Sequence, residues 1–276
     1  MQRSSPPRAL IITIYGLYAR EAGGWLSVAT TVRLLGALGV DGPAVRSSIS
    51  RLKRRRMLVA EQRGGAAGYG LSAEAHAILR EGDRRIFARG PAALDDGWVL
   101  VIFSVPEAER SRRHTLRSRL TWLGFGTVAP GVWIAPARVA DETADLLGRL
   151  GLSHYVDLFT AQHLDAAELR KHVSAWWDLD RLQRSYADYI ARWRPVLEAR
   201  REGGTTPRQA FADYVHTLTE WRRLPYLDPG LPEELLPDGW PGREAGDVFF
   251  GLRRLLAGPA HEFADHVRQD GTTATP

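Results

Sequence analysis

The side chains best suited to chemistry are the basic and hydroxyl groups gathered between residues 42 and 72. That stretch carries seven Lys and Arg residues and one acidic residue. The candidate contact residues are Arg46, Ser47, Ser50, Arg51, Lys53, Arg54, Arg55 and Arg63. Arginine can donate paired hydrogen bonds to the acceptor edge of a guanine or to a phosphate, and serine can reach either group. These residue types indicate a polyanionic partner, and we expect double-stranded DNA.

A helix predicted over residues 43–55 must position these side chains. Asp41 is a suitable N-cap for it. Val45, Ile49 and Leu52 fall at i, i+4 and i+7, so they form one buried stripe. The basic and hydroxyl residues are left on the open faces, where the early ones could reach base edges and the later ones phosphates.

The elements around this helix complete a recognisable motif. We expect helices at 8–22, 28–38 (capped by Ser27) and roughly 73–88 (capped by Ser72), and short strands at 57–63 and 67–71. Gly64-Gly65 joins the strands and is typical of a tight hairpin turn. Three helices, a hairpin and a closing helix predict a winged helix-turn-helix, whose second motif helix enters the major groove. Arg63 would then lie on the wing, beside the turn.

Charge is distributed unevenly along the chain. Residues 1–90 hold 15 Lys and Arg against 6 Asp and Glu, a net +9, whereas residues 91–276 hold 22 against 26, a net −4. Because nearly every basic residue is Arg, the total alone says little about nucleic acid, but its localisation favours a polyanion at the first domain. The alternative is a solvated amphipathic helix.

Several protein classes are excluded or disfavoured by composition. The 276 residues include no Cys, which excludes disulfide frameworks, thiolate metal sites and cysteine nucleophiles. The segment 9–19 resembles a signal peptide, but polar residues interrupt it and no clean cleavage site follows. No apolar run approaches the ~20 residues of a membrane span. We therefore expect a cytoplasmic protein without a membrane segment.

The middle of the chain predicts a second domain, after a linker at 91–97. Strands are expected at 98–105, 125–128, 132–135 and 155–160, with helices at about 106–123 and 138–150. This β-α-β-β-α-β order is typical of a ferredoxin-like unit. The chain is thus predicted to be α+β, with domains at 1–90, 91–165 and 166–276.

The last domain is predicted to be mainly helical. One helix is expected to run across Trp176-Trp177 to about Arg201, and Thr206-Pro207 begins another that ends near Arg223. Five prolines between 224 and 241 predict an irregular loop. A final apolar segment, 244–257, is expected to break at Gly258-Pro259 before a last short helix.

Two further groups of residues admit two interpretations each. Trp122, Trp133, Trp176 and Trp177 are candidates for an aromatic ligand pocket, although each could belong to the core. Five arginines on the helix at 106–123 could bind phosphates of a ligand or of DNA, or form a solvated face; they are Arg110, Arg112, Arg113, Arg117 and Arg119.

Enzymatic and metal-binding alternatives are weaker. HEFADH at 261–266 lacks the second His of HExxH, leaving His261 and Asp265 as a conceivable metal pair. GGAAGYG at 64–70 lies between strands, unlike a phosphate-binding loop. GFGTV at 124–128 lacks the aromatic positions of an RNA-recognition motif, since Thr127 and Pro130 stand there. We predict no catalytic residues, no metal and no cofactor.

The chain resembles the PaaX family of bacterial repressors over about residues 8–260. The resemblance rests on blocks in the same order: GGWL (23–26), VRSSISRLKRR (45–55), GYGLS (68–72), WVLVIFSVPE (98–107), RSRLTWLGFG (117–126), PGVWIAP (130–136) and WWDL (176–179). It implies a winged helix, a middle domain similar to a small CRISPR-associated nuclease, and a helical C-terminal domain.

The resemblance also implies a function. A homodimer would repress an aromatic-acid catabolic operon at a palindromic operator and be released by an aryl-CoA such as phenylacetyl-CoA. Nuclease or other enzyme activity of the middle domain is the alternative, but Ser104-Val105-Pro106 stands where the nucleases carry an Asp at the end of the first strand. A further alternative is a small-molecule sensor that acts through protein partners.

Overall fold

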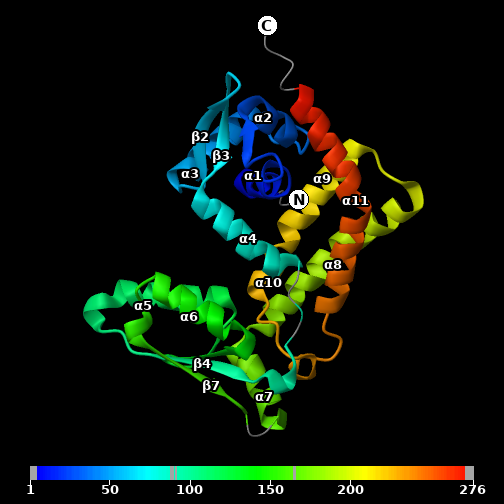
Figure 1. Cartoon of the computed structure of the whole chain (residues 1–276). Helices are drawn as coiled ribbons and strands as arrows, with labels where there is room; N and C mark the ends of the chain where they lie inside the picture. Colours follow the sequence, from blue (N-terminus) through cyan, green and yellow to red (C-terminus); the bar gives the residue numbers. More distant parts are fainter. Residues whose placement is uncertain (1–4, 88–89, 91, 164–165, 271–276) are drawn as a thin grey trace. The chain divides into compact units, whose positions relative to one another are not determined.

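The computed structural model describes residues 5–87, 90, 92–163 and 166–270 (Figure 1). Contacts divide the chain into two compact units. The first unit combines residues 1–86, 188–222 and 243–276, and the second combines residues 87–187 and 223–242. Residues far apart in the sequence therefore share a core in each unit. Compact units need not coincide with domains, so the division into three domains stays a prediction.

The first unit begins with the elements that carry the basic stretch. They are α1 (Pro7–Ile14), a π-helical turn (Tyr15–Ala19), β1 (Trp25–Ser27), α2 (Val28–Gly36), α3 (Gly42–Arg54), β2 (Leu58–Arg63), β3 (Ala66–Leu71) and α4 (Ala73–Phe87). The strands form an antiparallel sheet in the order β1-β3-β2. The predicted helices and hairpin are present, and β1 is an additional strand that the sequence did not predict.

Side-chain caps fix where these helices start. Ser27 accepts a hydrogen bond from the backbone N–H of Thr30 at 3.0 Å, and Asp41 accepts one from Ala44 at 2.7 Å. Ser72 likewise accepts from Ala75 at 3.0 Å. Each cap satisfies a backbone donor that the first turn of a helix leaves free. These predicted caps are confirmed.

The core of the first unit is apolar and includes the stripe of α3. Leu10, Ile11, Ile14, Tyr15, Leu34, Leu35, Val45, Ile49, Leu52 and Leu58 are all buried. Desolvation raises the pKa of Tyr15 to about 12, while its hydrogen bond with Thr31 lowers it. The Tyr15 hydroxyl also donates to the backbone oxygen of Tyr69 at 3.3 Å, which ties the π-helical turn after α1 to the sheet.

The C-terminal helices of this unit are α8 in part (Leu179–Gly203), α9 (Pro207–Trp221) and α11 (Gly242–Asp270). Thr206 caps α9 with Gln209 in a capping box, as Thr206-Pro207 predicted. Thr219 on α9 and Thr13 on α1 share a buried hydrogen bond of 2.7 Å. Arg33 on α2 donates to the backbone oxygen of Val267 on α11 at 2.8 Å. Two C-terminal helices therefore brace the N-terminal segment.

The expected break at Gly258-Pro259 is wrong, because α11 continues through both residues. Proline removes one backbone donor, whose usual acceptor would be the carbonyl of Leu255. The buried face nevertheless continues on both sides of the proline, with Leu256 and Ala260 fully buried. Burial of that face outweighs the local preference of Pro for a helix end.

The second unit contains a four-stranded antiparallel sheet in the order β5-β6-β4-β7. Its elements are β4 (Trp98–Phe103), α5 (Arg110–Leu123), β5 (Gly126–Ala129), β6 (Val132–Pro136), α6 (Ala140–Arg149), β7 (Val156–Ala161), α7 (Ala166–Trp176) and α10 (Leu224–Leu227). The β-α-β-β-α-β order agrees with the predicted order of elements.

Each face of this sheet packs against different elements. Val99 and Val101 lie in one core with α5 and α6, which are side by side in Figure 1. Trp98 and Ile134 lie in another core with α7 and the proline-rich segment, which supplies Leu231, Leu235 and Leu236. The segment 224–241 contains only short helical turns and buries these leucines, which explains how a loop so rich in proline is held in place.

The predicted helix across Trp176-Trp177 is wrong at that point, because α7 ends at Trp176 and α8 begins at Leu179. Asp178 accepts a hydrogen bond from the backbone N–H of Arg181 at 3.0 Å, so it caps α8. The Trp177 indole donates to the backbone oxygen of Gly124 at 2.9 Å. Two helices separated by a cap replace the single predicted helix. None of the helices among the described residues is long and apolar enough to cross a membrane.

Candidate nucleic-acid interface

Helix α3 buries one face and exposes the other. Val45, Ile49 and Leu52 are at most 5% exposed, together with Ser48. All eight candidate contact residues are exposed: Arg46, Ser47, Ser50, Arg51, Lys53, Arg54, Arg55 and Arg63. The first seven lie on α3 or directly after it, so one helix and its end present most of the candidate set to solvent.

The arginines of α3 differ in how they are held. Arg51 Nη2 donates to Ser47 Oγ at 2.9 Å, which orients this guanidinium along the exposed face. Within the described part of the chain, Arg46, Arg54 and Arg55 have no side-chain hydrogen bond or ion pair to another residue. A guanidinium without a protein partner keeps all its donors for an outside acceptor. One oriented arginine and three open ones thus share this surface.

Lys53 and Arg56 occupy the end of α3. The Lys53 ammonium lies 5.6 Å from the centre of the Tyr69 ring on β3, a cation–π contact. Arg56 has a φ of 55°, in the left-handed region that favours glycine. The backbone N–H of Arg56 donates to Lys53 O at 2.9 Å and that of Met57 to Leu52 O at 3.0 Å, the pattern of a Schellman C-cap. An arginine therefore stands where glycine is usual.

The hairpin that follows turns at Gly64 and Gly65, both with positive φ. The register pairs Arg63 with Ala66, so the loop has two residues. This conformation is the type that glycine allows without steric cost. Figure 1 shows the β2–β3 hairpin beside α3.

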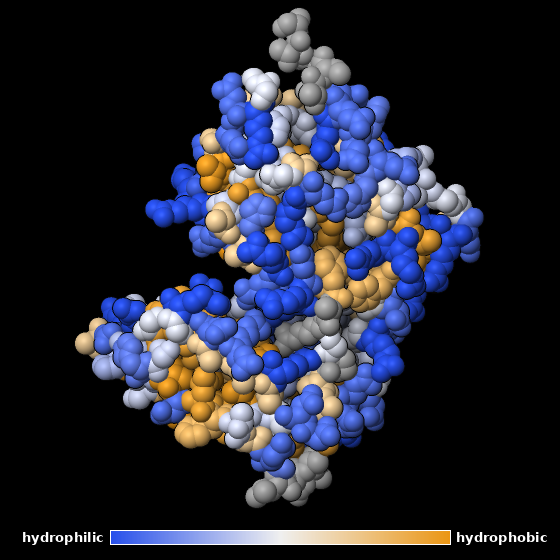
Figure 2. Space-filling view, viewed as in Figure 1, coloured by the Kyte–Doolittle hydropathy of each residue, from blue (hydrophilic) through white to orange (hydrophobic). Residues whose placement is uncertain are grey.

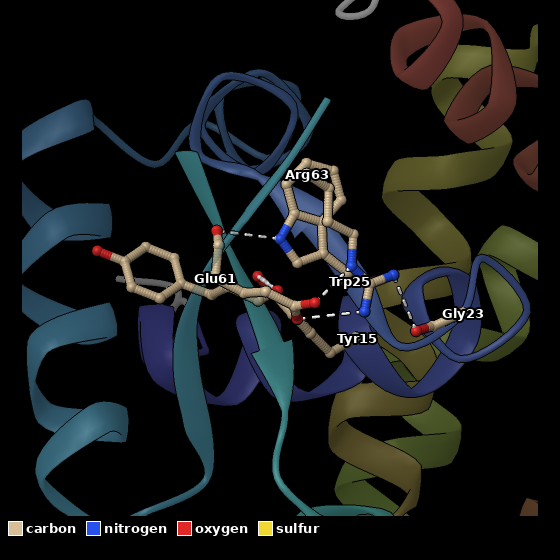
Figure 3. A network of polar contacts seen from close by, with 6 residues as sticks. Tyr15, Gly23, Trp25, Glu61 and Arg63 are labelled. Carbon is tan, nitrogen blue, oxygen red and sulfur yellow. Dashed lines mark hydrogen bonds and ion pairs between the residues drawn. The ribbon is translucent and has the colours of Figure 1, made fainter. Parts of the chain in front are cut away.

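Arg63, at the hairpin, is bound within the protein (Figure 3). Its Nε and Nη2 donate to the two carboxylate oxygens of Glu61 at 2.7 and 3.1 Å. Its Nη1 donates to the backbone oxygen of Gly23 at 3.3 Å, and its guanidinium carbon lies 5.6 Å from the centre of the Trp25 ring. The spacing of charged residues gave no signal of this network, because Trp25 and Gly23 come from a distant part of the sequence. Glu61 offsets the charge of Arg63, which distinguishes it from the open arginines of α3.

A second candidate site is a cavity of about 250 Å³ in the second unit. Three of the four predicted tryptophans line it, namely Trp133, Trp176 and Trp177, together with Phe125 and Tyr226. Trp122 does not line the cavity. Its ring centre lies 5.4 Å from that of Tyr226, so it contacts a residue that lines the cavity. The structure thus gathers aromatic residues from β6, α7 and α10 around one space.

The polar side chains that line this cavity are those of Thr121, Thr127, Asp178, Arg181 and Ser185. Arg181 is exposed and Ser185 is partly exposed, and both belong to the first turns of α8. The Ser185 hydroxyl donates to the backbone oxygen of Arg181 at 2.9 Å. The predicted site did not include Arg181 and Tyr226. They reach the cavity because α7 and α8 are separate helices and because α10 packs nearby, and the sequence predicted neither. The arrangement can hold a flat apolar group with an anionic substituent near Arg181.

His261 and Asp265, the conceivable metal pair, each contact another residue. The Nδ1–H of His261 donates to the backbone oxygen of Ala257 at 2.8 Å, and its Nε2 lies 3.2 Å from Glu21 Oε2. Asp265 instead pairs with Arg268 at 2.7 Å. No group of three or more His, Asp or Glu side chains within the described ranges is placed to hold a metal ion.

Comparison with known families covers most of the chain. Residues 6–75 match the family described as "PaaX-like protein", residues 91–173 match "PaaX protein central Cas2-like domain", and residues 177–266 match "PaaX-like protein C-terminal domain". A basic, exposed helix followed by a hairpin in the first of these regions fits a DNA-binding regulator. The chain belongs to the PaaX family, which confirms the resemblance seen in the sequence.

Two individual relatives extend this result. The transcriptional repressor PaaX of Escherichia coli K12 is 28% identical over 271 residues, which are 96% of this chain and 84% of that protein. The uncharacterized protein Rv0674 of Mycobacterium tuberculosis is similar in structure, with a TM-score of 0.52 and 22% identity over 93% of this chain and 99% of that one. The first relative indicates a DNA-binding regulator, and the second shows similarity of fold alone.

Proposed function

We propose that this protein is a transcriptional repressor that reads DNA with α3. The observation that carries the proposal is the exposed row of Arg46, Ser47, Ser50 and Arg51 on a helix whose opposite face is buried. In a helix-turn-helix protein the early residues of the recognition helix reach base edges in the major groove. Arg46 and Arg51 would read bases, and the later residues Arg54 and Arg55 would contact phosphates.

The surrounding elements support a winged helix as the fold of the DNA-binding region. Helices α2 and α3 would form the helix-turn-helix, and the β2–β3 hairpin with its Gly64-Gly65 turn would be the wing. For the central region, the strand order β5-β6-β4-β7 together with the element order supports a ferredoxin-like domain. The family description "Cas2-like" agrees with that proposal.

We also propose that the repressor acts as a homodimer on a palindromic operator. Two identical recognition helices related by a two-fold axis would enter major grooves about one helical turn apart, or a multiple of it. A candidate contact surface is the edge strand β7, where Leu158 and Phe159 are 37% and 51% exposed. Hydrophobic residues gather over this sheet in Figure 2. An edge strand can pair with its own copy in an antiparallel, symmetric way.

The effector is proposed to be an aryl-CoA thioester, of which phenylacetyl-CoA is the candidate. The aromatic cavity could enclose the aryl group between Trp133, Trp176 and Tyr226. A space of about 250 Å³ is too small for the whole coenzyme, so the nucleotide part would extend past Arg181 at the rim. Binding would release DNA if it favours a conformation with a lower affinity for the operator.

Selection of binding sites from a random DNA library by the full-length protein tests the proposal. We expect enrichment of one palindromic sequence by the wild-type chain. A variant carrying Arg46→Ala and Arg51→Ala should enrich no sequence, because the base-reading donors are gone. Recovery of the same palindrome by the double variant would refute α3 as the reading helix, and the absence of any DNA binding by the wild-type chain would refute the function itself.

A further inference from the structure

We propose that α5, in the second unit, is an additional surface that binds the phosphate backbone of double-stranded DNA. The proposal rests on the proposed function, since it adds a second contact to a protein that already binds DNA through α3. It assigns a role to four of the five arginines for which the sequence left two interpretations open. The surface consists of Arg110, Arg112, Arg117 and Arg119 and is called here the α5 arginine surface.

The charge of α5 contrasts with the charge of its own unit. Residues 110–119 contain five arginines and no acidic residue. The second unit as a whole holds 13 Lys and Arg against 16 Asp and Glu, a net −3. The arginine-rich composition of the chain therefore does not explain α5, because the rest of the unit is acidic. A cationic helix on an anionic body concentrates positive potential in one place.

Packing directs these arginines outward in two rows. Leu116, Leu120 and Leu123 are fully buried against the sheet, which fixes the inner face of α5. Arg110 and Arg117 are seven residues apart and so lie on one stripe of the helix, and Arg112 and Arg119 lie on another. All four are exposed. Figure 2 shows mainly hydrophilic residues where α5 lies.

Three small hydroxyl side chains and the exposed ring of His114 lie between the two rows. Ser111 and Ser118 are exposed and Thr115 is partly exposed. The Thr115 hydroxyl already donates to the backbone oxygen of Ser111 at 3.0 Å. Side chains of this size let a phosphate approach the helix, and hydroxyl groups can donate to it.

Ion pairs within the unit leave most of this charge available. Arg113, which is partly exposed, pairs with Glu107 at 2.9 Å and donates to Val105 O at 2.7 Å. Arg112 lies 4.0 Å from Glu109, a distance too long for a hydrogen bond. For Arg110, Arg117 and Arg119, the described residues provide no ion-pair or hydrogen-bond partner. Three arginines therefore remain for an outside anion.

The dimensions of the surface favour an extended polyanion over a single small phosphate. Seven residues of helix span about 10.5 Å at 1.5 Å per residue. A DNA strand carries one phosphate about every 3.4 Å along the duplex axis, so each row faces about three phosphates. Proteins that bind single strands offer aromatic rings for base stacking. The exposed residues of α5 between its rows are Ser111, His114 and Ser118, so no exposed Phe, Tyr or Trp is offered there for base stacking, which favours a duplex held by its backbone.

The test compares the DNA binding of two variants. One lacks three positive charges on α5, and the other lacks three positive charges elsewhere in the same unit. The test variant is Arg110→Gln, Arg117→Gln and Arg119→Gln. The control variant is Arg149→Gln, Arg184→Gln and Arg223→Gln, which changes exposed arginines outside α5 and leaves the same net charge. Binding of each full-length protein to a random-sequence DNA duplex and to the selected palindrome is measured at several salt concentrations.

We expect the test variant to bind both DNAs more weakly by the same factor. The slope of log K against log salt should fall in magnitude by about 2 to 3, because each lost phosphate contact contributes about 0.9. The control should keep a slope close to that of the wild-type protein. Equal slopes for the test variant and the wild type would overturn the proposal, as would equal losses in the test and control variants.

The measurements distinguish failure of the α5 proposal from failure of the proposed function. If the α3 double variant loses sequence preference while the α5 variant keeps the wild-type slope, α3 reads DNA and only the α5 proposal fails. A double-stranded RNA of the same length serves as a second probe. If the wild-type protein binds this RNA more tightly than the DNA duplex, and the test variant binds the two equally, DNA is overturned as the partner of this surface. Matching thermal unfolding curves for the three proteins exclude misfolding as the cause of any change.

Discussion

The carboxylate of Glu61 accepts two hydrogen bonds from the guanidinium of Arg63, at 2.7 and 3.1 Å, two residues along the same strand of the hairpin. The pair sets the charge of the proposed wing close to neutral. The arginine that sequence reasoning assigned to DNA is thus held in a contact that DNA would have to replace or extend. The contribution of the wing to DNA affinity therefore depends on whether the Glu61 carboxylate keeps Arg63 paired.

Substituting Glu61→Gln should therefore strengthen binding to DNA. The change removes one negative charge that would lie near the DNA backbone, and it frees the guanidinium of Arg63 to bind a phosphate. We expect the salt dependence on random duplex to steepen by about 1 in log–log slope. Glu74→Gln, which alters an exposed acid on α4, is the matched control. A Glu61→Gln protein with unchanged or weaker DNA binding would show that Arg63 has no part in the interface.

On α3, Arg51 and Arg54 should respond differently to replacement by alanine. Arg51→Ala should weaken binding to the selected palindrome by about 1–3 kcal/mol while leaving random DNA less affected, because it removes a base contact. Arg54→Ala should weaken both by the same factor, as expected for a phosphate contact. Titration of both DNAs by fluorescence anisotropy measures the difference. Equal losses for Arg51→Ala on the two DNAs would assign Arg51 to the backbone.

Arg56 offers a test of stability. Its left-handed backbone follows the end of α3, so Arg56→Gly should raise the free energy of unfolding by about 0.5–1 kcal/mol. Arg55→Gly is the control, since Arg55 has a φ of −87° and gains nothing from glycine. Urea unfolding of the full chain compares the three proteins. A loss of stability in Arg56→Gly would mean that the arginine side chain contributes more than its backbone strain costs.

The aromatic cavity predicts a ligand-dependent fluorescence change. Phenylacetyl-CoA added to the protein should quench tryptophan emission, and Trp176→Ala should weaken its binding about tenfold through loss of ring contacts. Trp176 is only half-buried, so its removal perturbs the core less than removal of Trp177 would. Trp240→Ala, a half-buried tryptophan that does not line the cavity, is the control. Equal affinity in the Trp176 variant and the wild type would place the ligand elsewhere.

The edge strand β7 predicts the oligomeric state. Phe159→Glu should shift the protein toward monomer in analytical ultracentrifugation, because it places a charge on the proposed symmetric contact. Ile78→Glu changes a side chain of similar exposure, 44%, on α4 and should leave the mass unchanged. A dimer that persists in the Phe159 variant would exclude this strand as the contact.

Local signals predicted much of the structure because they act within a few residues. The caps at Ser27, Asp41 and Ser72 and the stripe of Val45 and Ile49 depend only on their own turn of helix, and all are present. The two-residue turn at the hairpin is likewise a local property of its glycines.

What sequence patterns missed depends on contacts between distant segments. The helix through Pro259 survives because its buried face continues, and α7 ends at Trp176 because the following indole bonds to Gly124. The strand β1 forms only by pairing with β3. The same holds for the candidate sites. The helical periodicity of α3 predicted that its arginines are exposed. The network around Arg63 could not be predicted in this way, because it depends on how the fold brings distant segments together.

The most direct test of the central claim is the salt dependence of binding to the selected palindrome, measured for the wild type and for Arg46→Ala with Arg51→Ala. About six phosphate contacts predict a log–log slope on the order of −5 for the wild-type protein. The double variant should lose its preference for the palindrome over random DNA. Binding that is insensitive to salt, or a palindrome preference that survives in the double variant, would contradict recognition of DNA by α3.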